Sequence, residues 1–328
     1  MQPNVSITMS AYNVESFLRD CLDCVVNQTL HEIEIICVND GSSDGTLSIL
    51  REYAARDSRI VIIDKAVNEG LAVARNDALT LATGKYIGFV DGDDLLDRDL
   101  FRKAYERAEA TQCDLLFWDY VTFWEELDLA KLIHEPSQLH FLNPEDKDAL
   151  LNRPAFAWTK LLRTEKAREL AISFPKGLTY QDIPAHWTLV TQIDRIAILP
   201  ERLSYYRQQP AATTHSNGWK RADLVTVMDL VKEYLVSSGH YPTYRDLFLR
   251  KQLESFYGVY DVVDPTLQAQ VMRLIQERLG TDQWQYVTDG KALRWQVRDF
   301  YQALHGSLFA RARRALWLAA RQSYRAVK

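Results

Sequence analysis

The sequence Phe-Val-Asp-Gly-Asp-Asp at residues 89–94 places three carboxylates directly after a short apolar run. Residues 86–90 are predicted to form a buried strand, so the carboxylates emerge from its end. In open α/β sheets, ligands bind outside the carboxyl ends of the strands. Carboxylates such as Asp91 and Asp93 suit Mg²⁺ or Mn²⁺ and leave coordination positions for phosphate oxygens. The motif therefore predicts a divalent metal site. The alternative is an acidic turn in which Asp94 caps the next helix.

Short apolar strands alternate with longer amphipathic segments on both sides of this motif. This alternation predicts βαβ units and an α/β fold with a mostly parallel central sheet. The expected strands are residues 5–11, 33–38, 60–63, 86–90 and 115–118. The expected helices are residues 17–28, 44–56, 70–82 and 95–110.

The pattern becomes less regular in the middle of the chain and then turns helical. Residues 121–144 have no clear period and are expected to form a hairpin or an inserted loop. A helix is expected at 182–191, followed by two strands, 193–199 and 202–206, with a turn at Pro200 between them. A polar, turn-rich stretch then precedes a helical region that starts near Trp219. We therefore expect an α/β domain over 1–217 and a C-terminal α-helical domain over 218–328.

Two positions in the helical region carry helix boundary signals. Asp264 followed by Pro265 offers an N-cap with proline at the first helical position, and Gly280 offers a stop.

Composition excludes several classes of protein. The 328 residues are 47% hydrophobic and 25% charged, as in an ordinary globular protein, and the net charge is -5. The chain has no excess positive charge, so nucleic acid is a poor candidate partner. No stretch approaches the roughly 20 apolar residues that span a bilayer, and the start does not resemble a signal peptide. Four cysteines without a disulfide pattern favour a reducing, cytoplasmic location.

A second polar motif, Val-Asn-Asp-Gly-Ser-Ser-Asp-Gly-Thr at residues 38–46, follows the second expected strand. Asp40 at the strand tip could accept hydrogen bonds from a base or a ribose. The alternative is a flexible turn in which Ser43 or Asp44 caps the next helix. The dinucleotide-binding glycine pattern and the phosphate-binding loop lysine are both missing.

Three further residues or pairs are candidates for chemistry. Arg75 lies in an expected helix, from which its guanidinium could reach a diphosphate, and the alternative is a surface arginine. Asp182 lies at an expected helix start, where it could be a catalytic base or a helix cap. Tyr206 and Arg207, followed by a polar stretch at 213–216, could form a lid over phosphates.

Taken in order, these segments resemble the inverting glycosyltransferases of glycosyltransferase family 2, which have the GT-A fold. The resemblance covers roughly residues 4–216. The matching segments are residues 5–13, 38–46, 68–76, 91–94, 158–163, 174–177, 180–182 and 206–207.

The resemblance implies a nucleotide-sugar donor, most often a UDP-sugar, and a divalent metal, Mn²⁺ or Mg²⁺. It implies that Tyr12 and Asp40 hold the uracil, and that Asp91 faces the ribose. It also implies that Asp93 ligates the metal, with His215 approaching the metal or the diphosphate. The other implied nucleotide-sugar residues are Asn68, Arg75, Gly92, Tyr206 and Arg207.

The resemblance further implies that Asp182 is the base that activates an acceptor hydroxyl, with inversion at the anomeric carbon. The family usually has Glu-Asp at this position, whereas Gln181 precedes Asp182 here. A glycan or a lipid-linked glycan is the implied acceptor. The sequence identifies neither the sugar nor the oligomeric state.

Two other functions remain open at this point. A nucleotidyltransferase has a related α/β core, but a glycine-rich basic loop is expected after its first strand. Residues 10–14 are Ser-Ala-Tyr-Asn-Val, and no basic residue occurs before Arg19. A non-catalytic protein that binds glycans or nucleotides would need neither Asp93 nor Asp182.

The last segment, residues 306–328, is basic and amphipathic. It contains six arginine or lysine residues and no acid. At about 100° per residue, five of the six cations fall on one side of a helix. One interpretation is an interfacial helix that attaches the protein to anionic lipids on the inner face of the cytoplasmic membrane. The other is a terminal helix that packs against protein.

Overall fold

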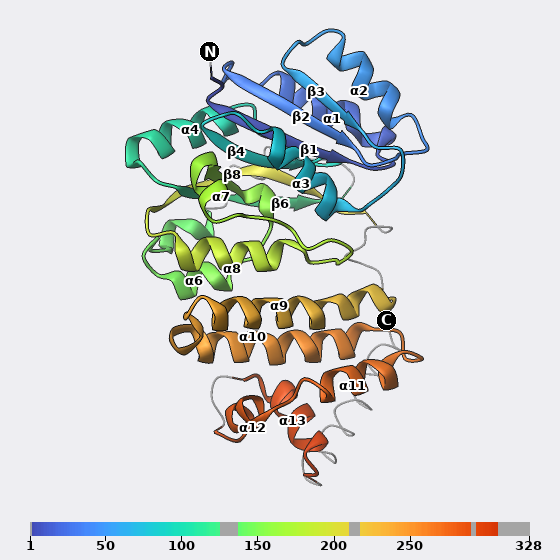
Figure 1. Ribbon diagram of the computed structural model, residues 1–328, viewed down its shortest axis with the longest axis vertical. Coiled ribbons are helices and arrows are strands. Elements are labelled where there is room, and N and C mark those ends of the chain that lie inside the picture. The colour runs from blue at the N-terminus through green and yellow to red at the C-terminus, as the bar shows by residue number, and fades with distance from the viewer. Residues whose placement is uncertain (1, 125–136, 210–216, 290–292, 308–328) are drawn as a thin grey trace. The chain divides into compact units, whose positions relative to one another are not determined.

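The computed structural model describes residues 2–124, 137–209, 217–289 and 293–307, which form the helices and strands drawn in Figure 1. Three expectations lie wholly or partly outside these residues: the roles of His215 and of the stretch 213–216, the loop expected over 121–144, of which 125–136 are not described, and the amphipathic helix, of which only 306 and 307 are described. The chain divides into two compact units between residues 215 and 216.

The first unit is built on one eight-stranded sheet with the order β3-β2-β1-β4-β7-β6-β8-β5. Six strands run in the same direction, while β7 and β5 are antiparallel to their neighbours. The expectation of an α/β fold with a mostly parallel sheet is confirmed. The strands are β1 (Val5–Ala11), β2 (Ile33–Asn39), β3 (Ile60–Asp64), β4 (Tyr86–Asp91), β5 (Leu95–Leu96), β6 (Leu115–Phe123), β7 (Lys160–Arg163) and β8 (Ile196–Arg207).

Helices cover both faces of the sheet, as a parallel sheet requires. Side chains alternate along β1, so that Val5, Ile7 and Met9 share one face, where they form a core with α1 and α4. Helix α3 contacts β1 and β2 outside that core, through small residues such as Ala74. The helices of this unit are α1 (Glu15–Val26), α2 (Thr46–Ala54), α3 (Leu71–Leu81), α4 (Leu100–Thr111), α6 (Lys147–Asn152), α7 (Thr164–Glu169) and α8 (Asp182–Gln192), with short 3₁₀ turns at Gln138–Phe141 and Ala157–Thr159.

The segment after the acidic motif differs from the expectation of a helix from residue 95. Leu95 and Leu96 instead form β5, which pairs with Tyr205 and Ser204 of β8. Helix α4 begins only at Leu100. Leu95 and Leu96 pair with β8 in the sheet, and this pairing outweighs the helical pattern of the local sequence.

The expectation of two strands separated by Pro200 is also wrong, because β8 continues through this residue. Leu199 pairs with Trp118 and Arg202 with Asp119. Pro200 and Glu201, which lie between them in β8, therefore have no counterpart in β6. Proline is tolerated at such a bulge because the ladder needs no N–H there. The partner strand β6 continues to Phe123, well beyond the expected end at residue 118.

The start of α2 is not capped by Ser43 or Asp44 as expected, since Gly45 occupies the N-cap position. Asp44 instead links two helix starts. Its carboxylate accepts hydrogen bonds from the backbone N–H groups of Thr46 (3.0 Å) and Glu15 (3.1 Å). These two hydrogen bonds hold the turn at residues 40–45 against the start of α1.

The second unit is helical, as expected from the sequence pattern. Its helices are α9 (Asp223–Ser237), α10 (Tyr241–Val262), α11 (Gln268–Gln276), α12 (Thr281–Thr288) and α13 (Trp295–Leu304), with a 3₁₀ turn at Trp219–Ala222. The two boundary signals act differently from the expectation. Asp264 accepts a hydrogen bond from the Thr266 N–H (2.9 Å) in a turn before α11, and Gly280 is the N-cap of α12.

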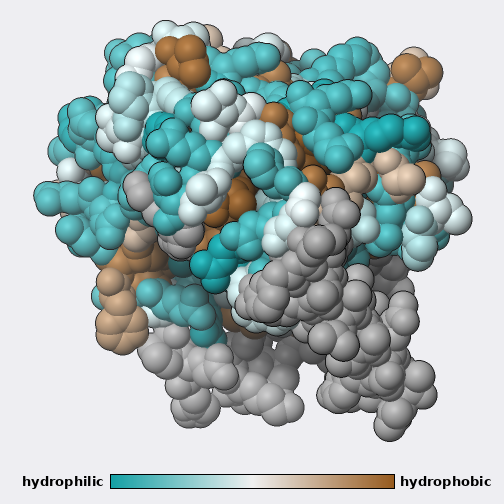
Figure 2. All heavy atoms as spheres, turned by 90° about the horizontal axis from the view of Figure 1, so that it is seen from below, coloured by the Kyte–Doolittle hydropathy of each residue, from teal (hydrophilic) through white to brown (hydrophobic). Residues whose placement is uncertain are grey.

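The surface of the molecule agrees with a protein of ordinary globular composition. Hydrophilic residues cover most of the coloured part of the face in Figure 2, and hydrophobic residues lie there in separate groups. Among the described helices, none is long and apolar enough to cross a bilayer.

Gly41 provides a test of the turn that follows β2. Its φ is +69°, and a Cβ built there would lie 2.5 Å from the Asn68 backbone nitrogen. Gly41→Ala is therefore expected to lower the free energy of unfolding by about 2 kcal/mol or more, measured by chemical denaturation. Gly177→Ala is the control, because Gly177 has a φ of +78° but no atom within 4 Å of the added Cβ. Equal losses in the two variants would show that the close approach at Gly41 carries no cost.

Candidate active site

The ends of three neighbouring parallel strands gather most of the predicted site residues at one edge of the sheet. Ala11 at the end of β1 lies opposite Asn39 of β2, and Ser10 lies opposite Asp91 of β4. Tyr12, directly after β1, is 48% exposed. The residues thus brought to this edge or to the loops beside it are Tyr12, Asp40, Asn68, Arg75, Asp91, Gly92, Asp93, Tyr206 and Arg207.

Asp40 is buried and holds the loop that leads into α3. One carboxylate oxygen accepts a hydrogen bond from the Glu69 N–H (2.9 Å), and the other from the Gly70 N–H (2.8 Å). Gly70 has a φ of +93°, which suits glycine at this turn. Asp40 therefore positions residues 68–70 beside the strand ends, a role that the sequence did not predict.

Arg75 is not the surface residue of the alternative interpretation, because its side chain is only 3% exposed. Its Nη2 donates to both carboxylate oxygens of Asp91, at 2.8 and 3.1 Å. The guanidinium also lies 5.6 Å from the ring centroid of Phe174. No described residue accepts a hydrogen bond from Nη1, although this atom is buried. A buried arginine requires a charged partner, so the pair fixes the Asp91 carboxylate at the end of β4.

The three carboxylates at the end of β4 have different environments. Asp91 is paired with Arg75, while Asp94 is buried and accepts a hydrogen bond from the Arg207 N–H (2.9 Å). Burial, and then the charges of Asp93 and Asp91, raise the pKa of Asp94 well above its usual range. Asp94 thus links β4 to the end of β8, and the interpretation of this residue as a helix cap is wrong.

Asp93 is the carboxylate best placed to bind a cation. Burial, followed by the charge of Asp91, raises the pKa of Asp93 to about 6. Its Oδ2 accepts a hydrogen bond from Gln209 Nε2 (3.1 Å), and no other side chain among the described residues donates to this carboxylate.

The described residues contain no group of three or more His, Cys, Asp and Glu side chains that could hold a metal by themselves. Mg²⁺ is commonly bound by one or two carboxylates together with substrate phosphates and water. The crowded negative charge at Asp91, Asp93 and Asp94 is the kind that a cation relieves. The residues present therefore fit a divalent ion that is completed by a diphosphate.

Arg207 forms part of the site wall. Its guanidinium lies 4.9 Å from the ring centroid of Phe17 and 4.8 Å from that of Phe123. Its Nε donates to the backbone oxygen of Asp93 (3.0 Å). Tyr206 and Arg207 belong to β8, so the expectation that they form a lid is wrong for these two residues. Residues 213–216 lie outside the described part of the chain.

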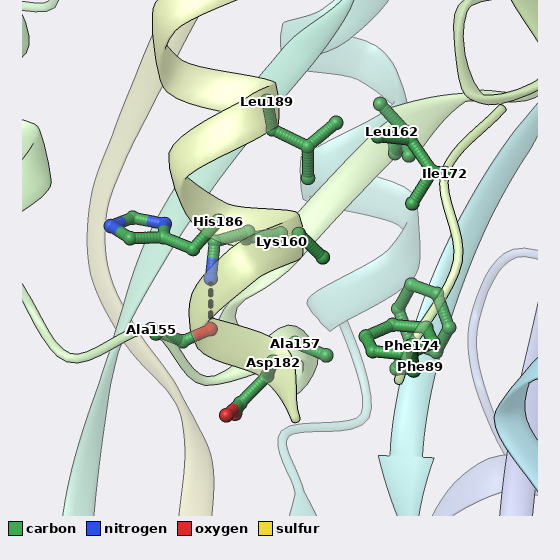
Figure 3. Close-up of a pocket in the computed structure, with 11 residues that line it drawn as sticks. Phe89, Ala155, Ala157, Lys160, Leu162, Ile172, Phe174, Asp182, His186 and Leu189 are labelled. Atoms are coloured by element: carbon green, nitrogen blue, oxygen red, sulfur yellow. Dashed lines mark hydrogen bonds between the residues drawn. The ribbon is translucent and has the colours of Figure 1, made fainter. Parts of the chain in front are cut away.

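Asp182 begins α8 and lines a small pocket beside the sheet edge (Figure 3). Gln181 holds the N-cap position without a side-chain hydrogen bond, so Asp182 lies in the first turn, where the helix dipole favours a carboxylate. The walls of the pocket are mostly apolar and include Phe89 and Phe174. Phe174 also lies close to the Arg75 guanidinium, so one ring contacts both this pocket and the arginine that holds Asp91.

Lys160 lies in the same pocket, and sequence analysis assigned it no role. Its ammonium donates to the backbone oxygens of Ala155 (2.9 Å) and Phe156. Burial lowers the pKa of Lys160 to about 7, although the charge of Asp182 acts in the opposite direction. A lysine inside an otherwise apolar segment, Lys-Leu-Leu at 160–162, was the available sequence signal.

Asn76 is a second residue whose function the sequence did not reveal. Its Nδ2 donates to the Phe174 carbonyl oxygen, and its Oδ1 accepts from the Phe174 N–H, both at 2.8 Å. An ion pair between Lys176 and Glu69 (2.9 Å) lies nearby. Together these contacts attach the segment that leads to Asp182 to the loop and helix that carry Arg75. No local sequence pattern predicts a pairing across 98 positions.

Comparison with solved structures identifies the fold. The crystal structure of Staphylococcus aureus TarS residues 1–349 in complex with UDP-GlcNAc matches with a TM-score of 0.75 and 20% sequence identity. The match covers 100% of this chain and 93% of that one. The protein therefore has the GT-A fold followed by C-terminal helices, and the expected fold class is confirmed.

Sequence comparison identifies the family. The sequence model described as "Glycosyl transferase family 2" matches residues 6–167. The putative teichuronic acid biosynthesis glycosyltransferase TuaG of Bacillus subtilis is 32% identical over 222 residues, which are 67% of this chain and 85% of TuaG. The uncharacterized glycosyltransferase EpsJ of Bacillus subtilis is 34% identical over 65% of this chain, and the match spans 64% of EpsJ. The chain belongs to glycosyltransferase family 2.

Lys160 gives a test that depends on pH. Its pKa is about 7 in the folded protein and about 10.4 in an unfolded chain, so the unfolded chain binds more protons between these values. The free energy of unfolding is therefore expected to rise with pH from 7 to 10, by up to about 1.4 kcal/mol per pH unit, relative to Lys160→Met. Chemical denaturation across this range measures the difference.

Lys176→Met is the matched control for this measurement, because the Lys176 side chain is 67% exposed. Its pH profile is expected to run parallel to that of the unmodified protein. Parallel profiles for the unmodified protein and Lys160→Met would contradict the lowered pKa of Lys160.

Proposed function

We propose that this protein is a metal-dependent, inverting glycosyltransferase that moves a sugar from a nucleotide sugar to an acceptor hydroxyl. The observation that carries the proposal is the arrangement at the end of β4. There Arg75 holds Asp91, while Gln209 is the one side chain among the described residues that donates to the Asp93 carboxylate. Membership of glycosyltransferase family 2 supports the same activity.

The donor site consists of the strand ends and the loops beside them. Tyr12 is exposed directly after β1 and offers an aromatic face to a base. Asp40 fixes residues 68–70, including Asn68, next to the strand ends, and Gly92 donates its N–H to Ser10 (3.1 Å). A UDP-sugar is the proposed donor, because the TarS structures contain UDP-GlcNAc and UDP.

The metal site of the proposal is Asp93, with Mn²⁺ or Mg²⁺ as the ion and His215 as a second candidate ligand. A bound cation would neutralise the charge that develops on the diphosphate leaving group. Arg207 supports this site, because its Nε donates a hydrogen bond to the backbone oxygen of Asp93.

Asp182 is the proposed general base. Its carboxylate accepts the proton of the acceptor hydroxyl, whose oxygen then attacks the anomeric carbon. Attack from the side opposite the diphosphate inverts the configuration, so an α-linked donor gives a β-linked product. Lys160 and Asn76 keep the loops around Asp182 in place through their backbone contacts.

The acceptor and the location follow from the same proposal. A glycan or a lipid-linked glycan is the proposed acceptor, in line with the name of TuaG, which refers to teichuronic acid biosynthesis. Catalysis is assigned to residues 1–217, with 218–328 as the helical domain. The proposed location is the cytoplasm, with attachment to the inner face of the membrane through 306–328 as an open alternative to packing on protein.

Asp93→Ala tests the metal site. The variant is expected to lose UDP binding in the presence of Mn²⁺ or Mg²⁺ and to lose several kcal/mol of transition-state stabilisation. Thermal shift with UDP and an assay of UDP release from UDP-sugars measure the two effects. Asp194→Ala is the control, because the Asp194 side chain is 94% exposed and pairs with Lys147, which is not a residue of the proposed site. Undiminished activity of Asp93→Ala would refute this assignment.

Asp182→Asn tests the general base. The amide keeps the shape of the side chain but removes its basicity, so kcat is expected to fall by about 10²–10⁴-fold. UDP binding should be unchanged, because the base faces the acceptor. Asp194→Asn, with a side chain that is 94% exposed just beyond the same helix, serves as the control. An unchanged kcat, or loss of folding in Asp182→Asn, would favour a structural role at the helix start.

A further inference from the structure

An aromatic cluster combines residues of the loop beside the Asp182 pocket with residues of β6 and β8. Phe156 and Trp158 stack with ring centroids 4.7 Å apart and an interplanar angle of 12°. Tyr206 packs against both rings at 5.8 and 5.2 Å, and Tyr120 does so at 5.5 and 5.1 Å. Trp158 is buried, whereas Phe156, Tyr206 and Tyr120 remain partly exposed. The cluster thus presents aromatic surface to solvent.

The place of the cluster in the chain connects it to both halves of the proposed site. Ala155 and Ala157, on either side of Phe156, line the same pocket as Asp182 (Figure 3). At the other end, Tyr206 immediately precedes Arg207, whose backbone and side chain contact Asp94 and Asp93. A group that rests on the cluster would therefore lie between the proposed base and the proposed diphosphate site.

Hydrogen bonds from Lys160 and Arg153 hold the loop that carries Phe156. Lys160 donates to the backbone oxygens of Ala155 and Phe156. At the start of the loop, Arg153 donates to Asp119 at 3.0 Å, and both of these side chains are largely buried. The Phe156 ring is thus positioned in advance, which reduces the entropy that a ligand would lose by ordering it.

We infer that the Phe156–Trp158–Tyr206 cluster is a stacking subsite for the pyranose ring of the acceptor. One face of the Phe156 ring lies against Trp158, and the ring is partly exposed, so the C–H face of a sugar can pack on its other side. A pyranose also carries the hydroxyl groups that Asp182 would deprotonate. This inference rests on the proposed function, because it assigns the acceptor subsite of that reaction.

The test uses the full chain and saturation-transfer NMR with the methyl β-glycosides of glucose, galactose and N-acetylglucosamine, and with ribitol as an acyclic control. Measurements are made with and without UDP and Mg²⁺. We expect saturation of the ring C–H protons of at least one glycoside and none for ribitol. Phe156→Leu removes the aromatic face but keeps an apolar side chain, and it is expected to weaken glycoside binding about tenfold. Phe156→Tyr should retain binding.

Phe141→Ala is the matched control, because Phe141 is 89% exposed and belongs to the same unit. Its glycoside and UDP binding should equal those of the unmodified protein, and UDP binding should also be unchanged in Phe156→Leu. Equal glycoside signals in the unmodified protein and Phe156→Leu, or no glycoside signal at all, would overturn the inference. A loss of UDP affinity in Phe156→Leu would likewise overturn it, since the ring would then serve the donor.

The result for the subsite is separable from the result for the proposed function. The glycoside measurement without UDP tests stacking alone. A failure of every UDP-sugar to turn over would overturn the proposed function, even if glycosides bind to Phe156.

Discussion

The ion pair between Arg75 and Asp91 is the contact on which the candidate site depends. Arg75 is almost completely buried, so its charge must be compensated within the protein, and Asp91 is the described residue that does this. The pair joins α3 to the end of β4, next to Asp93. The pair thereby fixes the end of β4, where the acidic motif begins. Asp93 is not part of the pair and remains available for the proposed cation.

Helix α3 and the loop before it also connect the two halves of the site. Asp40 holds the loop, Arg75 holds the end of β4, and Asn76 holds the backbone of Phe174 on the path to Asp182. The proposed nucleotide side and the proposed base side are thus tied to α3 and the loop before it. A substitution at any of these contacts is expected to affect both sides together.

Local patterns predicted the parts of the fold that depend on local physics. Buried parallel strands are continuous apolar runs, so β1 to β4 were found within a residue or two of their ends. The errors arose where distant pairing decides the structure. Leu95 and Leu96 form a strand because Tyr205 and Ser204 are available to them, and β8 passes through Pro200 because a bulge accommodates it. Neither partner is visible in a local window.

The same distinction applies to the site. The acidic motif and the position of Asp182 were apparent from residue type and from expected strand and helix ends. The burial of Arg75 and the pairing of Asn76 with Phe174 depend on contacts between distant segments. Lys160 bonds locally to residues 155 and 156, but the pocket that buries it also includes residues of α8, which is distant in the chain. Such contacts appear only when the chain is folded.

Inversion and dependence on a divalent cation are the two properties of the proposed reaction that distinguish it most sharply. The most direct measurement is proton NMR of the full chain with UDP-GlcNAc or UDP-glucose and Mg²⁺, with water as the acceptor. We expect the β-anomer of the released sugar to appear first, before mutarotation, and we expect a chelator to abolish its formation. Initial release of the α-anomer would contradict inversion, and release that is independent of the metal would contradict the proposed role of the cation.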